Sequence, residues 1–300
     1  MSHLKMKKKV LEALPQNCEP LIIHDNDPDG LCSSIIFKRY TGGKTRRLIG
    51  RANLSMDWYK RLNIEPASKT VILDIPEVEQ EFLDTQNVPV WIDHHMPQKR
   101  HNVLYVNPRN YDPNIYVPTT TMAQDFVGTK ETLWVAMVGS IADYHWPHFA
   151  EEFKSLYPDL CKRDTVQEAL LHDPISELVK LFFFLLKGER QEVEQHIRDL
   201  HKIKSPYELL TQSSKEGERL WKRFKKRDEV FTQVYKNARS KNTRSKLLVY
   251  EYQPGKWSFT SYLSNMLSTT DCFYVPWSPL ESLVVYCGLY GPLMPFFVSK

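Results

Sequence analysis

The sequence predicts an α/β protein: a parallel sheet flanked by helices, a helical extension, a linker helix and a small α/β unit near the C-terminal end. Three patterns predict it. Short apolar runs alternate with helix-length segments in the first half, apolar residues recur at three- and four-residue spacings from Thr119 onward, and a basic stretch precedes four short apolar runs. We place the domain boundaries at 1–210, 211–245 and 246–300.

The first half supplies the predicted sheet. Its apolar runs have strand length, and the segments between them are long enough for helices that connect parallel strands. Ligands collect beyond the carboxyl ends of such strands, where loops and helix N-termini converge. We expect strands at 20–24, 46–50, 70–75 and 88–93, and helices at 31–40, 54–62 and 77–85.

The second half is predicted to be mostly helical. Its most apolar run, 178–186, is far shorter than the roughly 20 residues that a membrane span needs, so we interpret it as a buried helix. Residues 214–246 carry twelve Lys or Arg against four Asp or Glu, an excess of 12 − 4 = +8, and are interpreted as a connecting helix. Helices are expected at 119–128, 131–145, 166–188 and 191–203, and short strands at 246–252, 257–261, 271–275 and 282–288.

Composition sets broad limits on the class of protein. The chain has 300 residues, 42% of them hydrophobic and 25% charged, with a formal net charge of +4, which permits a polyanionic substrate without requiring one. Five cysteines without a C-x-x-C pair favour a reducing, cytoplasmic location. The basic start is not followed by the apolar segment of a secretion signal, and we expect no membrane association.

Three carboxylates follow the first predicted strand. In the stretch "LIIHDNDPDGLCSS", Asp25, Asp27 and Asp29 occupy alternate positions, so on an extended backbone they point to the same side and repel one another. Either a bound cation neutralises them, or a turn directs them into water. Asp, Asn, Pro and Gly are common turn residues, so the stretch alone favours the turn.

Further acidic residues and histidines favour the cation. Asp74 ends the third predicted strand, Asp93, His94 and His95 end the fourth, and Asp143 follows in a helical segment. Carboxylates with one or two imidazoles suit manganese or a similar divalent ion. The set exceeds what one ion requires, and two ions are the usual arrangement for hydrolysis of phosphate esters.

The stretches "HDNDPDG", "ILDIP", "WIDHH" and "GSIADYH" resemble, in this order, the four motifs of the DHH phosphoesterase superfamily, and "SPYELL" resembles its RecJ-like archaeal branch. The resemblance covers residues 20–150, and more loosely extends to 210. It implies a phosphoesterase that hydrolyses phosphodiester bonds of single-stranded nucleic acid or short oligonucleotides. It further implies water activated by two Mn²⁺ ions, for which Mg²⁺ or Co²⁺ could substitute.

The same resemblance implies a role for each motif residue. The first motif would supply a ligand to each ion, Asp74 would bridge the ions, and His94 and Asp143 would complete the second ion's shell. His95 would face the substrate phosphate, and Asp93 would orient its neighbours through hydrogen bonds. The expected metal ligands are Asp25, Asp27, Asp29, Asp74, His94 and Asp143; the catalytic residues are His95 and Asp93; His24 is an alternative ligand.

Substrate contacts are expected from cationic side chains. Arg109, in the stretch 107–109, and Thr119–Thr121 could either contact phosphate or serve only the loop; of these, Arg109 is the natural partner of an anion. Within the basic stretch, Lys222, Arg223 and Lys226 could follow a nucleic-acid backbone, although such a stretch is more often a solvated helix face.

The resemblance is incomplete near the C-terminal end. Nucleic-acid-cleaving members of the superfamily carry a DHH-associated domain with a glycine-rich "GGGH"-like motif, which this sequence lacks, so that domain is expected to be shortened or divergent. Two alternatives remain open. One is hydrolysis of a small substrate such as a cyclic dinucleotide, phosphoadenosine phosphate or pyrophosphate; the other is a non-catalytic RecJ-like scaffold for replication or repair proteins.

Overall fold

We describe the fold from a computed structural model of the chain. The structure describes residues 3–49, 53–63, 67–240, 247–251, 255–268, 273–276 and 282–286. They divide into two compact units, Met1–Val179 with Lys204–Pro206, and Lys180–Ile203 with Tyr207–Lys300. Each unit is described by itself.

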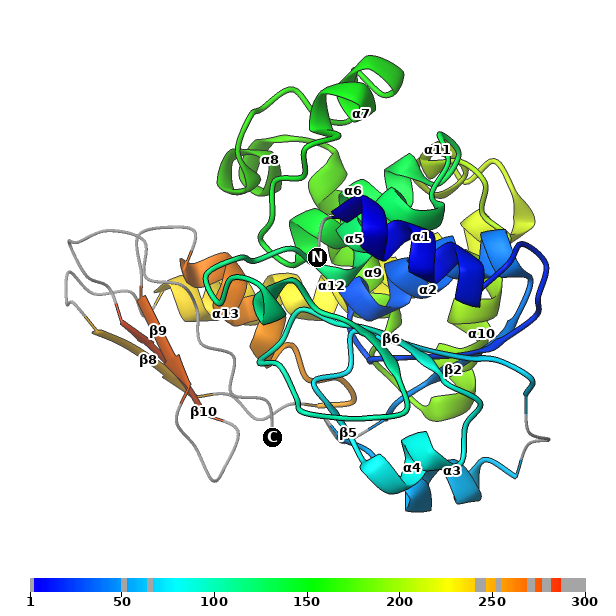
Figure 1. Cartoon of the computed structure of the whole chain (residues 1–300). Coiled ribbons are helices and arrows are strands. Elements are labelled where there is room, and N and C mark those ends of the chain that lie inside the picture. Colours follow the sequence, from blue (N-terminus) through cyan, green and yellow to red (C-terminus); the bar gives the residue numbers. More distant parts are fainter. Residues whose placement is uncertain are drawn as a thin grey trace. The chain divides into compact units, whose positions relative to one another are not determined.

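The first unit is built on a five-stranded parallel sheet with the order β2-β1-β4-β6-β7, which confirms the predicted α/β class (Figure 1). A second, two-stranded parallel sheet pairs β3 with β5. The strands are β1 (Leu21–His24), β2 (Lys44–Arg47), β3 (Asn53–Leu54), β4 (Thr70–Leu73), β5 (Glu77–Val78), β6 (Val90–Ile92) and β7 (Leu104–Val106).

Helices cover both faces of the five-stranded sheet, which explains why β1, β4 and β6 are buried along their whole length. In Figure 1, α3 and α4 lie on the opposite side of the sheet from α1 and α2. The helices are α1 (His3–Ala13), α2 (Pro28–Thr41), α3 (Met56–Arg61), α4 (Gln80–Asp84), the 3-10 helix η1 (Pro108–Asn110), α5 (Thr119–Val127), α6 (Leu133–Ala142), α7 (Ala150–Leu156) and α8 (Val166–His172).

The alternation of side chains along the strands builds two hydrophobic layers. Ile23, Ile72 and Trp91 point to the face of α3 and α4, where they join a buried cluster with Phe82. On the other face α2 packs against α5 and α6. The register pairs His24 with Leu73 and Leu73 with Ile92, so the three central strands end side by side.

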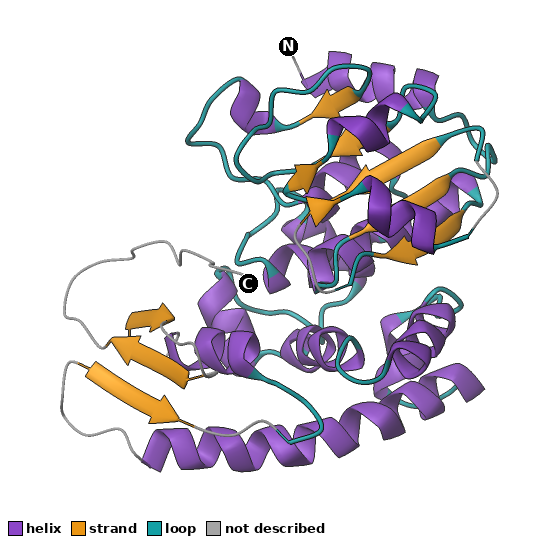
Figure 2. Ribbon diagram, turned by 90° about the horizontal axis from the view of Figure 1, so that it is seen from below, coloured by secondary structure: helices purple, strands orange, loops and turns teal. Residues whose placement is uncertain are grey.

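The second unit is mainly helical. Its aromatic core joins Phe184, Phe224, Phe231, Phe259 and Tyr262, whose ring centroids lie 4.9 to 6.0 Å apart in the contacting pairs. The long helix along the lower edge of Figure 2 is α12. The elements are α9 (Ile175–Leu185), which begins in the first unit, α10 (Arg190–Leu200), α11 (Pro206–Leu210), α12 (Lys215–Ser240), α13 (Thr260–Ser268) and an antiparallel sheet of β8 (Leu247–Glu251), β10 (Ser282–Tyr286) and β9 (Phe273–Pro276).

Arg227 is a buried cation that connects several residues in the core of the second unit. Although it belongs to the basic stretch, it is fully buried: its guanidinium donates to the Lys187 carbonyl and pairs with Glu192 at 3.1 Å, and it lies 4.8 Å from the Trp257 ring. One of the charges that the sequence assigns to a solvated face is therefore part of the core.

Several predicted elements need correction. Residues 257–261, expected as a strand, do not form one: residues 257–259 form a loop, Thr260 and Ser261 begin α13, and Phe259 packs into the aromatic core. The helix expected at 166–188 is interrupted at Pro174, and the helix expected at 77–85 spans only α4 after the short β5.

Smaller differences concern position. The strand expected at 46–50 occurs earlier, as β2, and α1, α7 and β7 had no counterpart in the prediction. Gly50 and the predicted strand ends at 246, 252, 271–272 and 287–288 lie outside the described residues. Among the described residues, no helix is long and apolar enough to cross a membrane.

The close packing of α2, α5 and α6 yields a test of the first unit. A Cβ at Gly139 would lie 2.6 Å from Thr120 Oγ1 and 2.7 Å from Cys32 Cβ. We expect Gly139→Ala to lower the free energy of unfolding by about 1–3 kcal/mol, as overpacking does. Gly255→Ala is the control, because nothing lies within 4 Å of its Cβ. Thermal melts of both variants check this; equal melting temperatures would contradict the packing.

Candidate metal centre

The loop after β1 is a turn and an acidic cluster at once. Asp27 is the N-cap of α2, and its Oδ1 accepts a hydrogen bond from the Gly30 amide at 2.8 Å. A Cβ at Gly30 would lie 2.8 Å from the backbone nitrogen of Asp25, so this close return of the chain requires glycine. The turn therefore holds Asp25 and Asp27 half-buried beside each other.

Asp29 is anchored by the N-terminus of α5. Its two carboxylate oxygens accept hydrogen bonds from the backbone amides of Thr119 at 2.8 Å and Thr120 at 2.7 Å. Thr119 Oγ1 also donates to Asp74 Oδ1 at 3.2 Å, and Thr121 bonds to Ser140. The first amides of α5, which lack partners within the helix, therefore hold Asp29, and the Thr119 hydroxyl holds Asp74.

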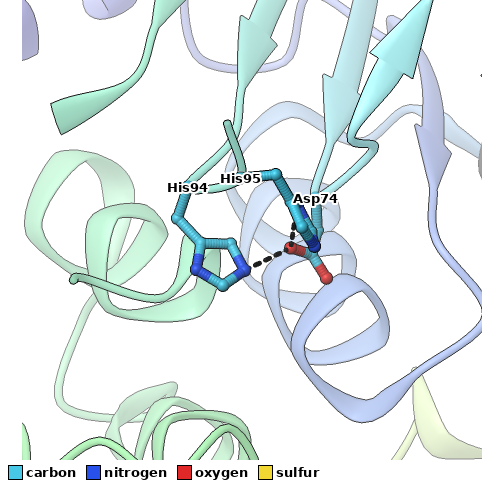
Figure 3. A group of neighbouring side chains, drawn as sticks. All are labelled: Asp74, His94 and His95. Atoms are coloured by element: carbon cyan, nitrogen blue, oxygen red, sulfur yellow. Dashed lines mark ion pairs between the residues drawn. The ribbon is translucent and has the colours of Figure 1, made fainter. Parts of the chain in front are cut away.

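Asp74 and His94 meet at the ends of β4 and β6 (Figure 3). His94 Nε2 lies 3.2 Å from Asp74 Oδ1, and His95 Nδ1 lies 4.0 Å from the same oxygen. Asp74 has a left-handed backbone, with φ 60°, which aspartate tolerates better than most residues. Its Oδ2 and the Nδ1 of His94 are buried, and neither has a hydrogen-bond partner among the described residues.

The ligand-type atoms form overlapping groups, within each of which they lie no more than 4.8 Å apart. His94 connects these groups, since its Nε2 lies 3.6 Å from Asp143 and 3.9 Å from Asp29. Asp143 follows α6 as its C-cap. The groups are Asp25, Asp27 and Asp74; Asp29, His94 and Asp143; and Asp74, His94 and His95.

Without a cation, ionising the buried carboxylates of this cluster costs free energy. Burial, and then repulsion from Asp29, raise the pKa of both Asp74 and Asp143 well above the usual range. Burial and the charge of Asp27 raise the pKa of Asp25 to about 7. Burial lowers the pKa of His94 to about 3, which keeps its imidazole in the neutral form that binds metal. Carboxylates, a neutral imidazole and an unpaired buried oxygen fit a hard divalent cation.

Asp93 lies outside the carboxylate groups and holds His95 instead. Its Oδ1 accepts from His95 Nδ1 at 2.7 Å, while Oδ2 accepts from the His95 amide at 3.1 Å and from Asn107 Nδ2 at 3.2 Å. Burial lowers the pKa of His95, but the hydrogen bond and charge of Asp93 outweigh it, so that pKa is raised. The His95 side chain is 38% exposed and is accessible to a ligand.

Tyr116 is a site residue that the sequence did not indicate. Its hydroxyl donates to Asp143 Oδ2 at 2.5 Å, and its ring meets His94 edge-on, with centroids 5.1 Å apart. Burial raises its pKa, so the phenol stays a donor. Its position in the loop before α5 offers no local pattern that separates it from Tyr111.

The remaining expected residues differ in their surroundings. Arg109 lies at the edge of the site, 5.9 Å from the Tyr116 ring centroid. His24 is fully buried, its Nδ1 lies 2.7 Å from the Asp25 carbonyl oxygen, and burial lowers its pKa to about 4; it belongs to none of the three groups. Lys222, Arg223 and Lys226 lie on α12 of the second unit.

Comparison with solved structures identifies the fold. The chain is similar to manganese-bound exonuclease RecJ (TM-score 0.57, 15% identity, 91% of this chain and 79% of that chain). It is also similar to the DHH domain of a member of the s1p family of ribosomal proteins (TM-score 0.54, 13% identity, 89% and 71%). No protein-family model and no curated protein sequence matches the chain.

A third similar structure is RecJ from Thermus thermophilus in complex with Mn²⁺ (TM-score 0.50, 17% identity). That alignment covers 78% of this chain but only 38% of the larger Thermus protein. The fold is therefore similar to that of RecJ and of a DHH domain, in agreement with the resemblance of the four sequence motifs to the DHH superfamily and of "SPYELL" to its RecJ-like branch. The chain also carries groups of Asp and His residues that could hold a metal ion.

Metal binding can be tested through stability. We expect Mn²⁺ to raise the melting temperature of the wild type and EDTA to reverse the rise, because a cation relieves the repulsion among buried carboxylates. Asp74→Asn should abolish the Mn²⁺ effect and, since it removes one buried charge, should not lower the metal-free melting temperature. Asp57→Asn, at an exposed carboxylate of α3, is the control. An unchanged Mn²⁺ response in Asp74→Asn would contradict the site.

The role of Asp93 can be separated from that of a ligand. Asp93→Asn removes the anionic acceptor of His95 but no member of the carboxylate groups. We expect the pKa of His95, followed by an NMR titration, to fall, because the hydrogen bond and charge of Asp93 raise it, while the Mn²⁺-induced rise in melting temperature persists. Loss of the Mn²⁺ response would instead make Asp93 a ligand.

Proposed function

We propose that this chain is a manganese-dependent phosphoesterase that hydrolyses phosphodiester bonds of single-stranded nucleic acid or short oligonucleotides. The observation that carries the proposal is the pair of groups around His94 and Asp74, namely Asp25, Asp27 and Asp74, and Asp29, His94 and Asp143. The groups are linked by the 3.2 Å approach of His94 to Asp74. The similarity in fold to manganese-bound RecJ supports the same metal and the same class of substrate.

Two ions fit the residues better than one. Asp25 and Asp27 approach Asp74 from the loop after β1, while Asp29 and Asp143 approach His94 from α2 and the end of α6. Asp74 lies between the two sets and would serve both. Bound ions would supply positive charge to a phosphate and lower the pKa of a water molecule that attacks it. Mg²⁺ or Co²⁺ could occupy the same oxygen-rich groups.

The protein's own residues complete the proposed mechanism. Asp93 fixes the His95 ring through Nδ1, which leaves Nε2 directed away from that carboxylate. Asp93 raises the pKa of His95 and so favours its protonated form, in which Nε2–H would donate to a phosphate oxygen. Tyr116 and the amides of α5 hold Asp143 and Asp29 in place, so little rearrangement is needed when a substrate binds. Arg109, at the rim, is the proposed partner of a phosphate.

The proposal is tested by hydrolysis of two labelled substrates, an oligothymidylate and a linear dinucleotide, with Mn²⁺ and with EDTA. We expect Mn²⁺-dependent loss of the oligothymidylate by wild type and by Asp57→Asn, and none by Asp74→Asn. Cleavage of the dinucleotide alone would replace the proposal with a small-substrate phosphodiesterase. Binding of the oligothymidylate without hydrolysis of either substrate would favour a scaffold that assembles with replication or repair proteins.

A further inference from the structure

Helix α12 has two unlike faces. Its buried residues recur every three or four positions, or multiples of these, so they form one stripe along the helix. The stripe packs into the core of the second unit through Phe224 and Phe231. Its members are Gly217, Leu220, Phe224, Arg227, Phe231 and Ala238.

The opposite face of the first three turns is cationic. Lys215, Arg219, Lys222 and Lys226 follow one another at spacings of four, three and four residues, so they lie in a row about 16 Å long at 1.5 Å per residue. With Arg223 and a single carboxylate, Glu218, they line an open hollow of about 440 Å³. We call the five cations, Lys215, Arg219, Lys222, Arg223 and Lys226, the α12 cationic face.

The row ends abruptly within the same helix. Beyond Lys226 the exposed positions that continue the row are Glu229, Gln233 and Asn237, none of them cationic, and the exposed Lys236 and Arg239 lie outside the row in the last turns. A helix that needed only solubility would have no reason to gather five of its seven exposed cations in three consecutive turns. The clustering therefore indicates an anionic ligand for this part of the helix.

Acidic residues of α10 hold two of the five cations. Arg219 forms a two-point pair with Asp199, at 2.7 and 2.8 Å, and Arg223 lies 3.2 Å from Glu192. These pairs fix the guanidinium groups and offset part of their charge. Lys222 and Lys226 are exposed, and within the described part of the chain neither forms an ion pair. They therefore carry most of the uncompensated charge.

We propose that the α12 cationic face binds the sugar–phosphate backbone of single-stranded nucleic acid. A row of cations with one carboxylate suits a ligand of regularly repeated negative charge better than a small anion. The aromatic residue beside the row, Trp221, is half-buried, packs on Phe224 and is covered by Lys225 at 5.1 Å. It is not presented for stacking, so the face would grip the backbone without reading bases. The choice of single strands rests on the proposed function.

The test measures binding without cleavage. All variants carry Asp74→Asn and are studied in EDTA, and fluorescence anisotropy follows a labelled oligothymidylate over a series of NaCl concentrations. Lys222→Gln with Lys226→Gln removes two charges from the α12 cationic face. Lys236→Gln with Arg239→Gln removes two exposed charges from the last turns of the same helix and is the matched control. Circular dichroism verifies that both double variants keep the wild-type helix content.

We expect the first double variant to bind severalfold more weakly at low salt. Its slope of log K against log salt should be shallower by about 1.4, at about 0.7 per phosphate contact in single strands. The control should keep the parent slope. Equal losses in both double variants would overturn the proposal, since net charge alone would then explain binding. Binding of duplex DNA as tight as that of oligothymidylate, lost in the same variant, would overturn the single-strand assignment.

The experiment also separates this inference from the proposed function. If the wild type hydrolyses neither test substrate, yet oligothymidylate binding depends on Lys222 and Lys226, the phosphoesterase assignment fails and the α12 cationic face stands. If the wild type hydrolyses a test substrate while oligothymidylate binding does not depend on Lys222 or Lys226, the α12 cationic face fails as a binding site and the phosphoesterase assignment stands.

Discussion

Electrostatic repulsion among buried carboxylates is the constraint on which the first unit depends. Asp29, Asp74 and Asp143 are brought together in a region of low water access, where burial and then the charge of Asp29 raise the pKa of both Asp74 and Asp143. Neighbouring residues offset part of the cost of ionising these carboxylates by donating hydrogen bonds to them. Helix α5 offers its first amides to Asp29, Tyr116 donates to Asp143, and His94 stands neutral among all three. The ends of the strands bring the acidic residues together, and helix α5 supplies hydrogen-bond donors to Asp29.

The same constraint explains local backbone features that otherwise look unfavourable. A left-handed φ at Asp74 and a glycine pressed against the Asp25 backbone both bring carboxylates to one edge of the sheet. Such conformations persist only where the surrounding structure holds them, and they concentrate at functional sites. Here the surrounding structure is the fully buried ends of three adjacent strands, which leave the loops little freedom.

Much of the fold and of the site could be predicted from the sequence, because the signals are local. Apolar runs followed at once by acidic residues locate both the strands and the edge at which they end, so Asp25, Asp74 and Asp93 could be placed on one rim. Tyr116 and the anchoring amides of Thr119 and Thr120 could not, since their roles depend on how a long loop folds back onto the sheet. Nothing in the chain near Tyr116 marks it.

In the second unit, local sequence patterns were less able to predict the structure. Counting charges in residues 214–246 indicates a basic helix but cannot separate its faces, and Arg227, one of the counted cations, lies in the core. The short run at 257–261 suggested a strand, yet Phe259 packs into the aromatic cluster around Phe184. In both cases tertiary packing overrode a local preference that was itself correct.

The anchoring of Asp29 also has a consequence for synthesis of the chain. Its amide donors come 90 and 91 residues later, and Asp143 comes later still. Domains generally fold as units, so the first unit can complete its fold only after all its elements have been synthesised. A nascent chain that has emerged only as far as α4 would therefore hold Asp25, Asp27 and Asp29 without their partners from α5 and α6. The candidate ligand groups are therefore complete only once the chain has been made past Asp143.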